Sequence, residues 1–163
     1  MGIERVVCLD KMEQLVPLIR ETVAMGKSIR IAPMGTSMQP MLRQEIDSVV
    51  LSAPPQQLRR FDLPLYRRDS GQYILHRVVS VENGYTCVGD NQFQLEKGIR
   101  HDQVIAVVTG FYKTEKYNSV SCVSYRVYCC LWHYSRPLRR FYRRGKSWLR
   151  RHIFGNYSKN GTK

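Results

Sequence analysis

Residues 72–91 read QYILHRVVSVENGYTCVGDN and carry the strongest structural signal in the chain. Two runs rich in β-branched and aromatic residues, YILHRVVSV and YTCVG, flank Glu82-Asn83-Gly84. An Asn-Gly pair between two such runs is typical of a tight hairpin turn, because both residues tolerate positive φ. The stretch therefore predicts a β-hairpin and, with it, a domain built on antiparallel strands.

Shorter β-like runs surround this hairpin, with turn signals about every ten residues. They are SIRIAP (28–33), DSVVLSAP (47–54), DLPLYRR (62–68) and QVIAVVTGFY (103–112). Pro64 in the third run indicates a strand start or an edge, because proline cannot donate a hydrogen bond inside a sheet. Regularly spaced short strands predict a compact, mainly β domain.

A different periodicity precedes the strands. Residues 10–26, DKMEQLVPLIRETVAMG, predict an amphipathic helix with Asp10 as its N-cap and Gly26 as its stop. Pro17 is expected to kink or break this helix, because it lacks the backbone N–H that an internal turn requires. The apolar residues near helical spacing are Leu15, Leu18, Ile19 and Val23.

The charge of the chain is concentrated at its C-terminal end. The formal net charge is +13 over 163 residues; residues 1–112 hold 13 basic and 12 acidic side chains, whereas residues 113–163 hold 13 and 1. Residues 113–163 therefore account for +12 of the net charge of +13. Such a tail favours polyanionic partners, either anionic lipid or nucleic acid.

Cysteine spacing and hydropathy narrow the class of protein further. The five cysteines include no C-x-x-C pair, so we expect no zinc site and no disulfide framework. We also expect no cofactor, and a reducing compartment as the location of the protein. The N-terminus lacks the apolar core of a secretory signal. Residues 117–134 form a possible single C-terminal transmembrane span, but Asn118, Arg126 and His133 interrupt their apolar character.

Two separate features of the sequence suggest a catalytic site. Residues 34–42, MGTSMQPML, surround Ser37 with uncharged neighbours, and a serine hydroxyl needs a positioned base to act as a nucleophile. Of the four histidines, His76 lies in the strongest β-run, where a strand would set its direction. The alternative interpretation is structural: Gly35 and Pro40 shape a tight turn, and His76 is a half-buried strand residue.

The order of these motifs is informative. GTSMQPML is followed by YILHRVV and then by VGDNQFQLE. This order resembles the signal peptidase branch of the serine peptidases that also include the SOS-repressor autopeptidases, over about residues 29–112. The resemblance implies a compact peptidase β-barrel over residues 28–113, preceded by an N-terminal helical segment (1–27) and followed by a basic amphipathic helical tail (114–163).

The resemblance also implies roles for single residues. Ser37 matches the nucleophile and His76 the base of the branch that uses histidine rather than lysine. The position of the orienting aspartate in that branch holds Glu96 here. We expect Glu96 to be the third catalytic residue and Asp90 a structural or orienting acid, with Asp102 as a further alternative.

The same resemblance implies how a peptide or precursor-protein substrate would be held. Gly35 permits the backbone turn, Thr36 and the Ser37 N–H are the expected oxyanion donors, and Met38 and Pro40 belong to the substrate-binding loop. Small substrate residues are expected at the two positions that matter before the cut. Arg77 is expected to make structural contacts with acidic residues.

The tail suggests where such an enzyme would act. Its aromatic residues alternate with arginines, which is typical of a helix lying on an anionic membrane surface, here at the cytoplasmic face. No nucleic-acid module is recognisable, so a nucleic-acid partner is not expected. The competing functional hypothesis is a non-catalytic, membrane-associated binding module on the same fold.

Overall fold

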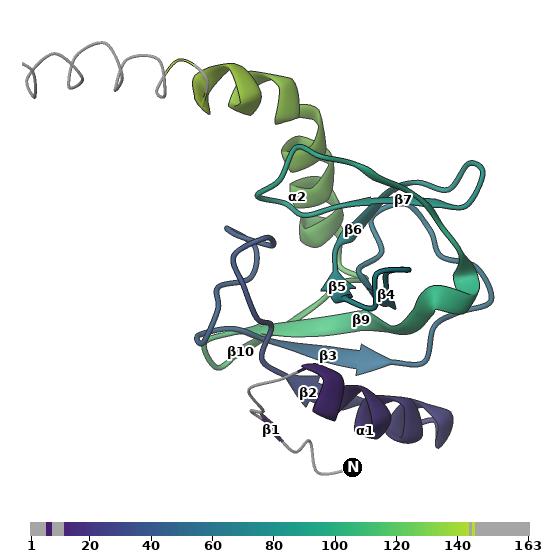
Figure 1. Ribbon diagram of the computed structural model, residues 1–163. Helices are drawn as coiled ribbons and strands as arrows, with labels where there is room; N and C mark the ends of the chain where they lie inside the picture. Colours follow the sequence, from purple (N-terminus) through teal and green to yellow (C-terminus); the bar gives the residue numbers. More distant parts are fainter. Residues whose placement is uncertain (1–5, 8–11, 144, 146–163) are drawn as a thin grey trace, which may run out of the picture. The chain divides into compact units, whose positions relative to one another are not determined.

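The computed structural model describes residues 6–7, 12–143 and 145. The chain divides into two compact units, residues 1–129 and 130–163. The first unit is mainly β, as the sequence predicts, and Figure 1 shows its strands with the helix α1 beside them. In the second unit, residues 130–134 and 136–143 are helical.

Within the described residues, the larger sheet has seven strands. Their order is β1 (Val6–Val7), β2 (Ile29–Ile31), β3 (Ser48–Ser52), β9 (Val104–Lys113), β4 (Pro64–Arg67) and β5 (Tyr73–Leu75), while β10 (Lys116–Ser119) also pairs with β9. The β1–β2 pair is parallel and the other pairs are antiparallel. The ten-residue β9 therefore joins β3, β4 and β10 into one layer. Pro64 begins β4, which agrees with the strand start expected there.

A smaller sheet of the described chain contains the hairpin predicted at Asn83-Gly84. Its strands are β6 (Arg77–Ser80), β7 (Tyr85–Val88) and β8 (Glu96–Ile99), all antiparallel. The turn between β6 and β7 places Asn83 at φ 51° and Gly84 at φ 88°. Both values are positive, as the Asn-Gly signal requires, so the predicted hairpin is confirmed.

The prediction of one continuous strand through YILHRVVSV is wrong. The run divides at His76: β5 belongs to the larger sheet and β6 to the smaller one. The apolar pattern continues across the break, from the partly buried residues of β5 to the buried His76, Arg77 and Val78, so hydropathy contains no sign of the division. His76 itself is 2% exposed and lies where the chain passes from one sheet to the other.

The mainly β class is confirmed, but the described strands form open sheets and no closed barrel. One hydrophobic core lies between α1 and the larger sheet, with contacts to β2, β3 and β9. A second cluster is built around the smaller sheet and includes Tyr66, Val78 and Cys87. A short 3-10 helix, His101–Gln103, leads into β9.

The N-terminal helix α1 spans Met12–Ala24 and continues through Pro17. Pro17 is exposed, so water can reach the carbonyl that its missing N–H leaves without a partner. Gly26 has φ 70°, and the Gly26 and Lys27 N–H groups donate to the carbonyls of Val23 and Thr22. This is the glycine-ended stop that the sequence predicts.

The buried face of α1 differs by one position from the expected stripe. Leu15, Ile19 and Val23 are buried as predicted, but Val16 is also buried and Leu18 is 39% exposed. The expected N-cap, Asp10, lies outside the described residues.

The region after β9 is less helical than the sequence suggests. Residues 117–119 belong to β10, and the helix α2 covers Val123–Tyr134. A Cβ on Gly110 would lie 2.5 Å from the Tyr117 ring, so this ring covers the glycine of the neighbouring strand.

In the part of the chain that is described, no helix has the length and apolar character needed to cross a bilayer.

Candidate active site

A close contact between the His76 imidazole and the Glu96 carboxylate forms the centre of the candidate site. His76 Nδ1 lies 3.0 Å from Glu96 Oε1. Glu96 begins β8 of the smaller sheet, and His76 occupies the break between β5 and β6. The pair therefore depends on the packing of chain segments that are 20 residues apart (96 − 76).

Two further side chains hold the Glu96 carboxylate in place. The Tyr66 hydroxyl and Arg68 Nε each donate to Oε2 at 2.8 Å, and a second Arg68 nitrogen donates to Oε1. Tyr66 lies in β4, and Arg68 directly follows the last residue of this strand, so an extended chain would place both side chains on the same side. Neither residue was predicted from the sequence, although their two-residue spacing in DLPLYRR was a usable signal once Glu96 was suspected.

Burial and hydrogen bonding set the charges of the pair. Burial acts to raise the pKa of Glu96, but hydrogen bonds from Arg68 and Tyr66 outweigh it, so this pKa lies below its usual value. Burial lowers the pKa of His76, and the negative charge of Glu96 opposes this only in part. A neutral imidazole beside a carboxylate favours the tautomer with its proton on Nδ1, which leaves Nε2 as an acceptor.

Gly89 provides the space in which Ser37 and His76 approach each other. A Cβ built on Gly89 would lie 2.7 Å from the Ser37 carbonyl oxygen, and 3.1 Å from both Ser37 Cβ and His76 Nε2. Any larger residue would therefore collide with the serine backbone. Glycine is needed here because of this close approach, and Nε2 faces the same point as the Ser37 side chain.

The loop that carries Ser37 is attached to the Gly-Asp-Asn segment by backbone contacts. The Asn91 N–H donates to the Ser37 carbonyl at 2.8 Å, and Asn91 Nδ2 donates to the Thr36 carbonyl at 3.2 Å. Gly35 has φ 79°, a conformation that residues with a side chain rarely adopt. The turn expected at Gly35 is present, and the following Gln39–Pro40 peptide bond is cis.

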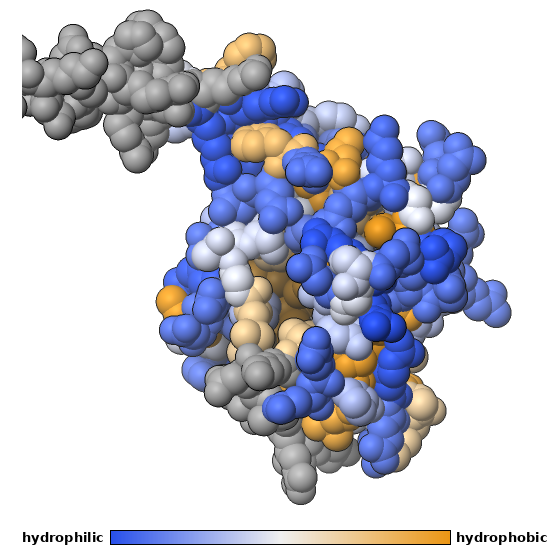
Figure 2. Space-filling view, in the orientation of Figure 1, coloured by the Kyte–Doolittle hydropathy of each residue, from blue (hydrophilic) through white to orange (hydrophobic). Residues whose placement is uncertain are grey.

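A small apolar cavity of about 90 Å³ opens beside Ser37. Figure 2 shows a hollow with hydrophobic residues at its floor on this face of the molecule. Of the predicted substrate-binding residues, Gly35 and Met38 line the cavity, whereas Thr36 and Pro40 are exposed outside its lining. The apolar part of the lining includes Ile31, Leu42, Leu65, Ile74 and Leu75.

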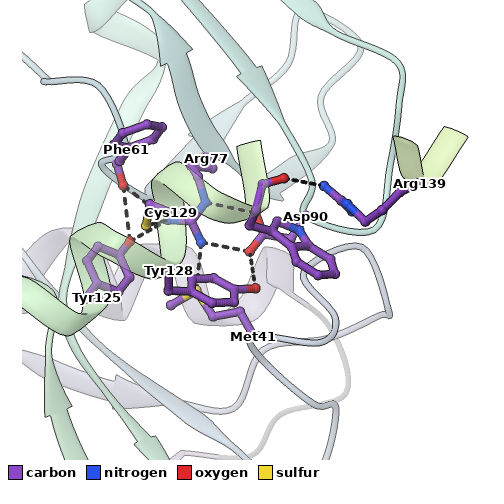
Figure 3. A network of polar contacts seen from close by, with 9 residues as sticks. Met41, Phe61, Arg77, Asp90, Tyr125, Tyr128, Cys129 and Arg139 are labelled. Atoms are coloured by element: carbon purple, nitrogen blue, oxygen red, sulfur yellow. Dashed lines mark hydrogen bonds and ion pairs between the residues drawn. The ribbon is translucent and has the colours of Figure 1, made fainter. Parts of the chain in front are cut away.

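Asp90 has a different partner from Glu96. Arg77 Nε and Nη2 donate to the two Asp90 oxygens at 2.8 Å each, a bidentate ion pair with 3% and 2% side-chain exposure (Figure 3). Contact between Arg77 and an acidic residue was expected from the sequence and is present. Asp102, the third acid considered, bonds Arg100 at 3.2 Å. Glu96 is thus the one of the three acids that contacts His76.

The first turns of α2 complete the surroundings of this buried pair. Arg77 Nη1 donates to the Tyr125 hydroxyl at 2.7 Å, and that hydroxyl donates to the Phe61 carbonyl at 3.1 Å. Cys129 Sγ lies 2.8 Å from Arg77 Nη1, and the Tyr128 hydroxyl donates to Asp90 at 3.3 Å. The helix therefore bonds to the residues that directly follow His76 and Gly89 in the chain.

The site contains no obvious metal centre. Among the described residues, no three His, Cys, Asp or Glu side chains are grouped so that they could hold an ion.

Comparison with protein-family models finds no match to this chain. Comparison with curated proteins finds no match either.

The buried pair allows a direct test of its contribution to stability. Replacing Arg77 with methionine should lower the free energy of unfolding by about 3–5 kcal/mol, because it leaves the Asp90 carboxylate buried without its counter-charge. The double variant R77M/D90N should recover part of this loss. Urea denaturation followed by circular dichroism measures both, with Arg100→Met as an exposed control expected to change stability by less than about 0.5 kcal/mol. A double variant no more stable than R77M would contradict this account.

Proposed function

We propose that this protein is a serine endopeptidase resembling signal peptidase, with Ser37 as nucleophile, His76 as general base and Glu96 as orienting acid. The observation that carries the proposal is the 3.0 Å contact between Glu96 and His76 Nδ1, together with the position of Nε2 and Ser37 Cβ, which both lie 3.1 Å from the point that a Cβ on Gly89 would occupy. A nucleophile, a base and an acid on the far side of the base are the recurrent elements of serine hydrolases.

In the proposed reaction, His76 Nε2 takes the proton from Ser37 Oγ as the oxygen attacks the carbonyl carbon of the scissile bond. The imidazolium then returns this proton to the leaving amine as the C–N bond breaks, which leaves an acyl-enzyme on Ser37. Water, deprotonated by the same nitrogen, hydrolyses the ester and restores the serine. Glu96 stabilises the imidazolium without taking its proton.

The oxyanion of the tetrahedral intermediate needs hydrogen-bond donors close to Ser37. The Ser37 backbone N–H and the Thr36 hydroxyl are the donors that we propose. Gly35 contributes the backbone turn that presents them. The cavity beside Ser37 would accept a small apolar side chain of the substrate, in line with its volume of about 90 Å³ and its lining.

A substrate peptide also needs partners for its backbone. Strand β5 ends the path of the larger sheet in the described chain, and its residues Ile74 and Leu75 line the cavity. An extended peptide could add to this edge as a further strand, which would bring its carbonyl groups past Ser37.

The first test is hydrolysis by single-residue variants. Ser37→Ala should abolish cleavage of peptides with small residues before the cut, and His76→Ala should reduce it by at least about 100-fold. Cleavage is followed by mass spectrometry, alongside labelling of Ser37 by a serine-directed fluorophosphonate. Ser70→Ala and His101→Ala, both exposed, serve as matched controls that retain activity. Full cleavage by both site variants would sink the proposal, and absence of cleavage and labelling in the unmodified protein would favour the non-catalytic binding module.

The pH profile tests the assigned base. Only neutral His76 can accept a proton, so kcat/KM should rise with pH through the pKa of His76, and burial places this midpoint below the usual value of about 6.5. Glu96→Gln removes the negative charge that raises the His76 pKa, so the midpoint should move to still lower pH while the rate falls. A midpoint that moves upward in Glu96→Gln would show that Glu96 does not act on His76.

Gly89→Ala tests the close approach around Ser37. The added methyl group would collide with the Ser37 carbonyl and move the nucleophile away from Nε2, so activity should fall by roughly 100-fold while the protein stays folded. Gly145→Ala is the control, because a Cβ at that position meets no atom within 4 Å. Equal activity of the two variants would contradict the proposed geometry.

A further inference from the structure

The helix α2 presents two faces of different character. Its inner face places Tyr125 and Cys129 against Arg77, as Figure 3 shows, and both residues are buried. The opposite face is apolar but exposed, and it continues into the following helical residues. We call this second face the outer stripe; it consists of Val123, Val127, Leu131, Tyr134, Leu138 and Phe141.

Four residues of the outer stripe belong to α2, and Leu138 and Phe141 follow in the helical residues 136–143. Its members are spaced by three or four residues, which places them on one side of a helix. Two backbone bonds bracket the turn at Ser135: the Ser135 N–H donates to the Leu131 carbonyl and the Arg139 N–H donates to the Ser135 carbonyl, each at 3.0 Å.

The exposed apolar side chains of the outer stripe indicate a binding surface. Its members range from 50% exposed for Val127 to 76% for Val123, and Leu138 and Phe141 are each 72% exposed. Folded proteins rarely leave a row of large apolar side chains in water, and such rows usually mark an interaction surface. The inner face uses none of these residues.

The surrounding charge indicates the chemistry of that partner. Residues 116–163 contain 12 basic side chains and no acidic one. Arg136, Arg140 and Arg143 lie within the same helical stretch as the outer stripe, and the Arg139 guanidinium stacks 3.7 Å above the Trp132 ring. The partner should therefore be apolar at its centre and anionic around it.

We propose that the outer stripe binds the surface of an anionic lipid bilayer, with α2 lying parallel to the membrane plane. The apolar side chains enter the boundary between headgroups and acyl chains, and the arginines interact with lipid phosphates. This surface differs from the Ser37 cavity in residues and in chemistry, so the proposal does not depend on peptidase activity.

Other occupants fit the surface less well. A second copy would bring two strongly basic segments together with no acidic residue after Glu115 to offset them. A nucleic acid would satisfy the arginines but would leave the six apolar side chains of the stripe in water. An anionic bilayer satisfies both groups at once.

Vesicle binding by the full chain tests this proposal. Binding is measured by co-sedimentation with vesicles of phosphatidylcholine alone and of phosphatidylcholine mixed with phosphatidylglycerol, at low and high salt. We expect binding to the anionic vesicles, and at least about tenfold weaker binding by Leu131→Asp and Leu138→Asp, because each change removes a leucine from the apolar layer. Met25→Asp makes the same kind of change at a 58% exposed residue in the turn after α1, and this variant should bind as the unmodified protein does.

Several results would overturn the proposal. One is equal binding to both kinds of vesicle; another is a loss in Met25→Asp as large as that in Leu131→Asp, which would show a charge effect alone. A dimer abolished by Leu138→Asp, without vesicle binding, would assign the stripe to a second copy. Salt-sensitive RNA binding without vesicle binding would assign the tail to nucleic acid. Ser37→Ala should bind vesicles normally, which separates this test from that of the peptidase.

Discussion

The buried ion pair between Arg77 and Asp90 is the interaction on which the arrangement of the site depends. Each partner directly neighbours a residue of the site, because Arg77 follows His76 and Asp90 follows Gly89. With exposures of 3% and 2%, both charges have lost most of their hydration, so their attraction must be supported by further hydrogen bonds. Tyr125 and Tyr128 of α2 supply them, and the helix is thereby tied to the interior of the β unit.

The two ion pairs near the candidate site are built differently. Asp90 and Arg77 neutralise each other and hold segments together, whereas Glu96 is shared between Arg68, Tyr66 and His76. Hydrogen bonds from Arg68 and Tyr66 hold the pKa of Glu96 below its usual value, while burial lowers the pKa of His76 and so favours the neutral imidazole. This combination of charged acid and neutral imidazole is what a general base with an oriented ring requires. The chemistry proposed for Ser37 follows from this environment rather than from the serine itself.

The accuracy of sequence-based prediction varied with the range of the interactions involved. The hairpin at Asn83-Gly84 and the stop at Gly26 were predicted correctly, because both depend on backbone conformations that few residues tolerate. The division of one β-run at His76 was not predicted, since β-branched and apolar residues continue across it and hydropathy does not mark it. Tyr66 and Arg68 were missed because their role exists only where β4 meets the start of β8.

The sequence by itself determined the mainly β class, the hairpin, the neutral loop around Ser37 and the strongly basic tail, all of which are local in composition or spacing. It also left three acids as candidate partners of His76. Only the tertiary structure decided among them: Glu96 contacts the imidazole, Asp90 pairs with Arg77, and Asp102 bonds Arg100. The physical reason is that His76 and Glu96 are 20 residues apart (96 − 76), so their contact depends on how β8 packs against the break between β5 and β6 rather than on a spacing that can be seen along the chain.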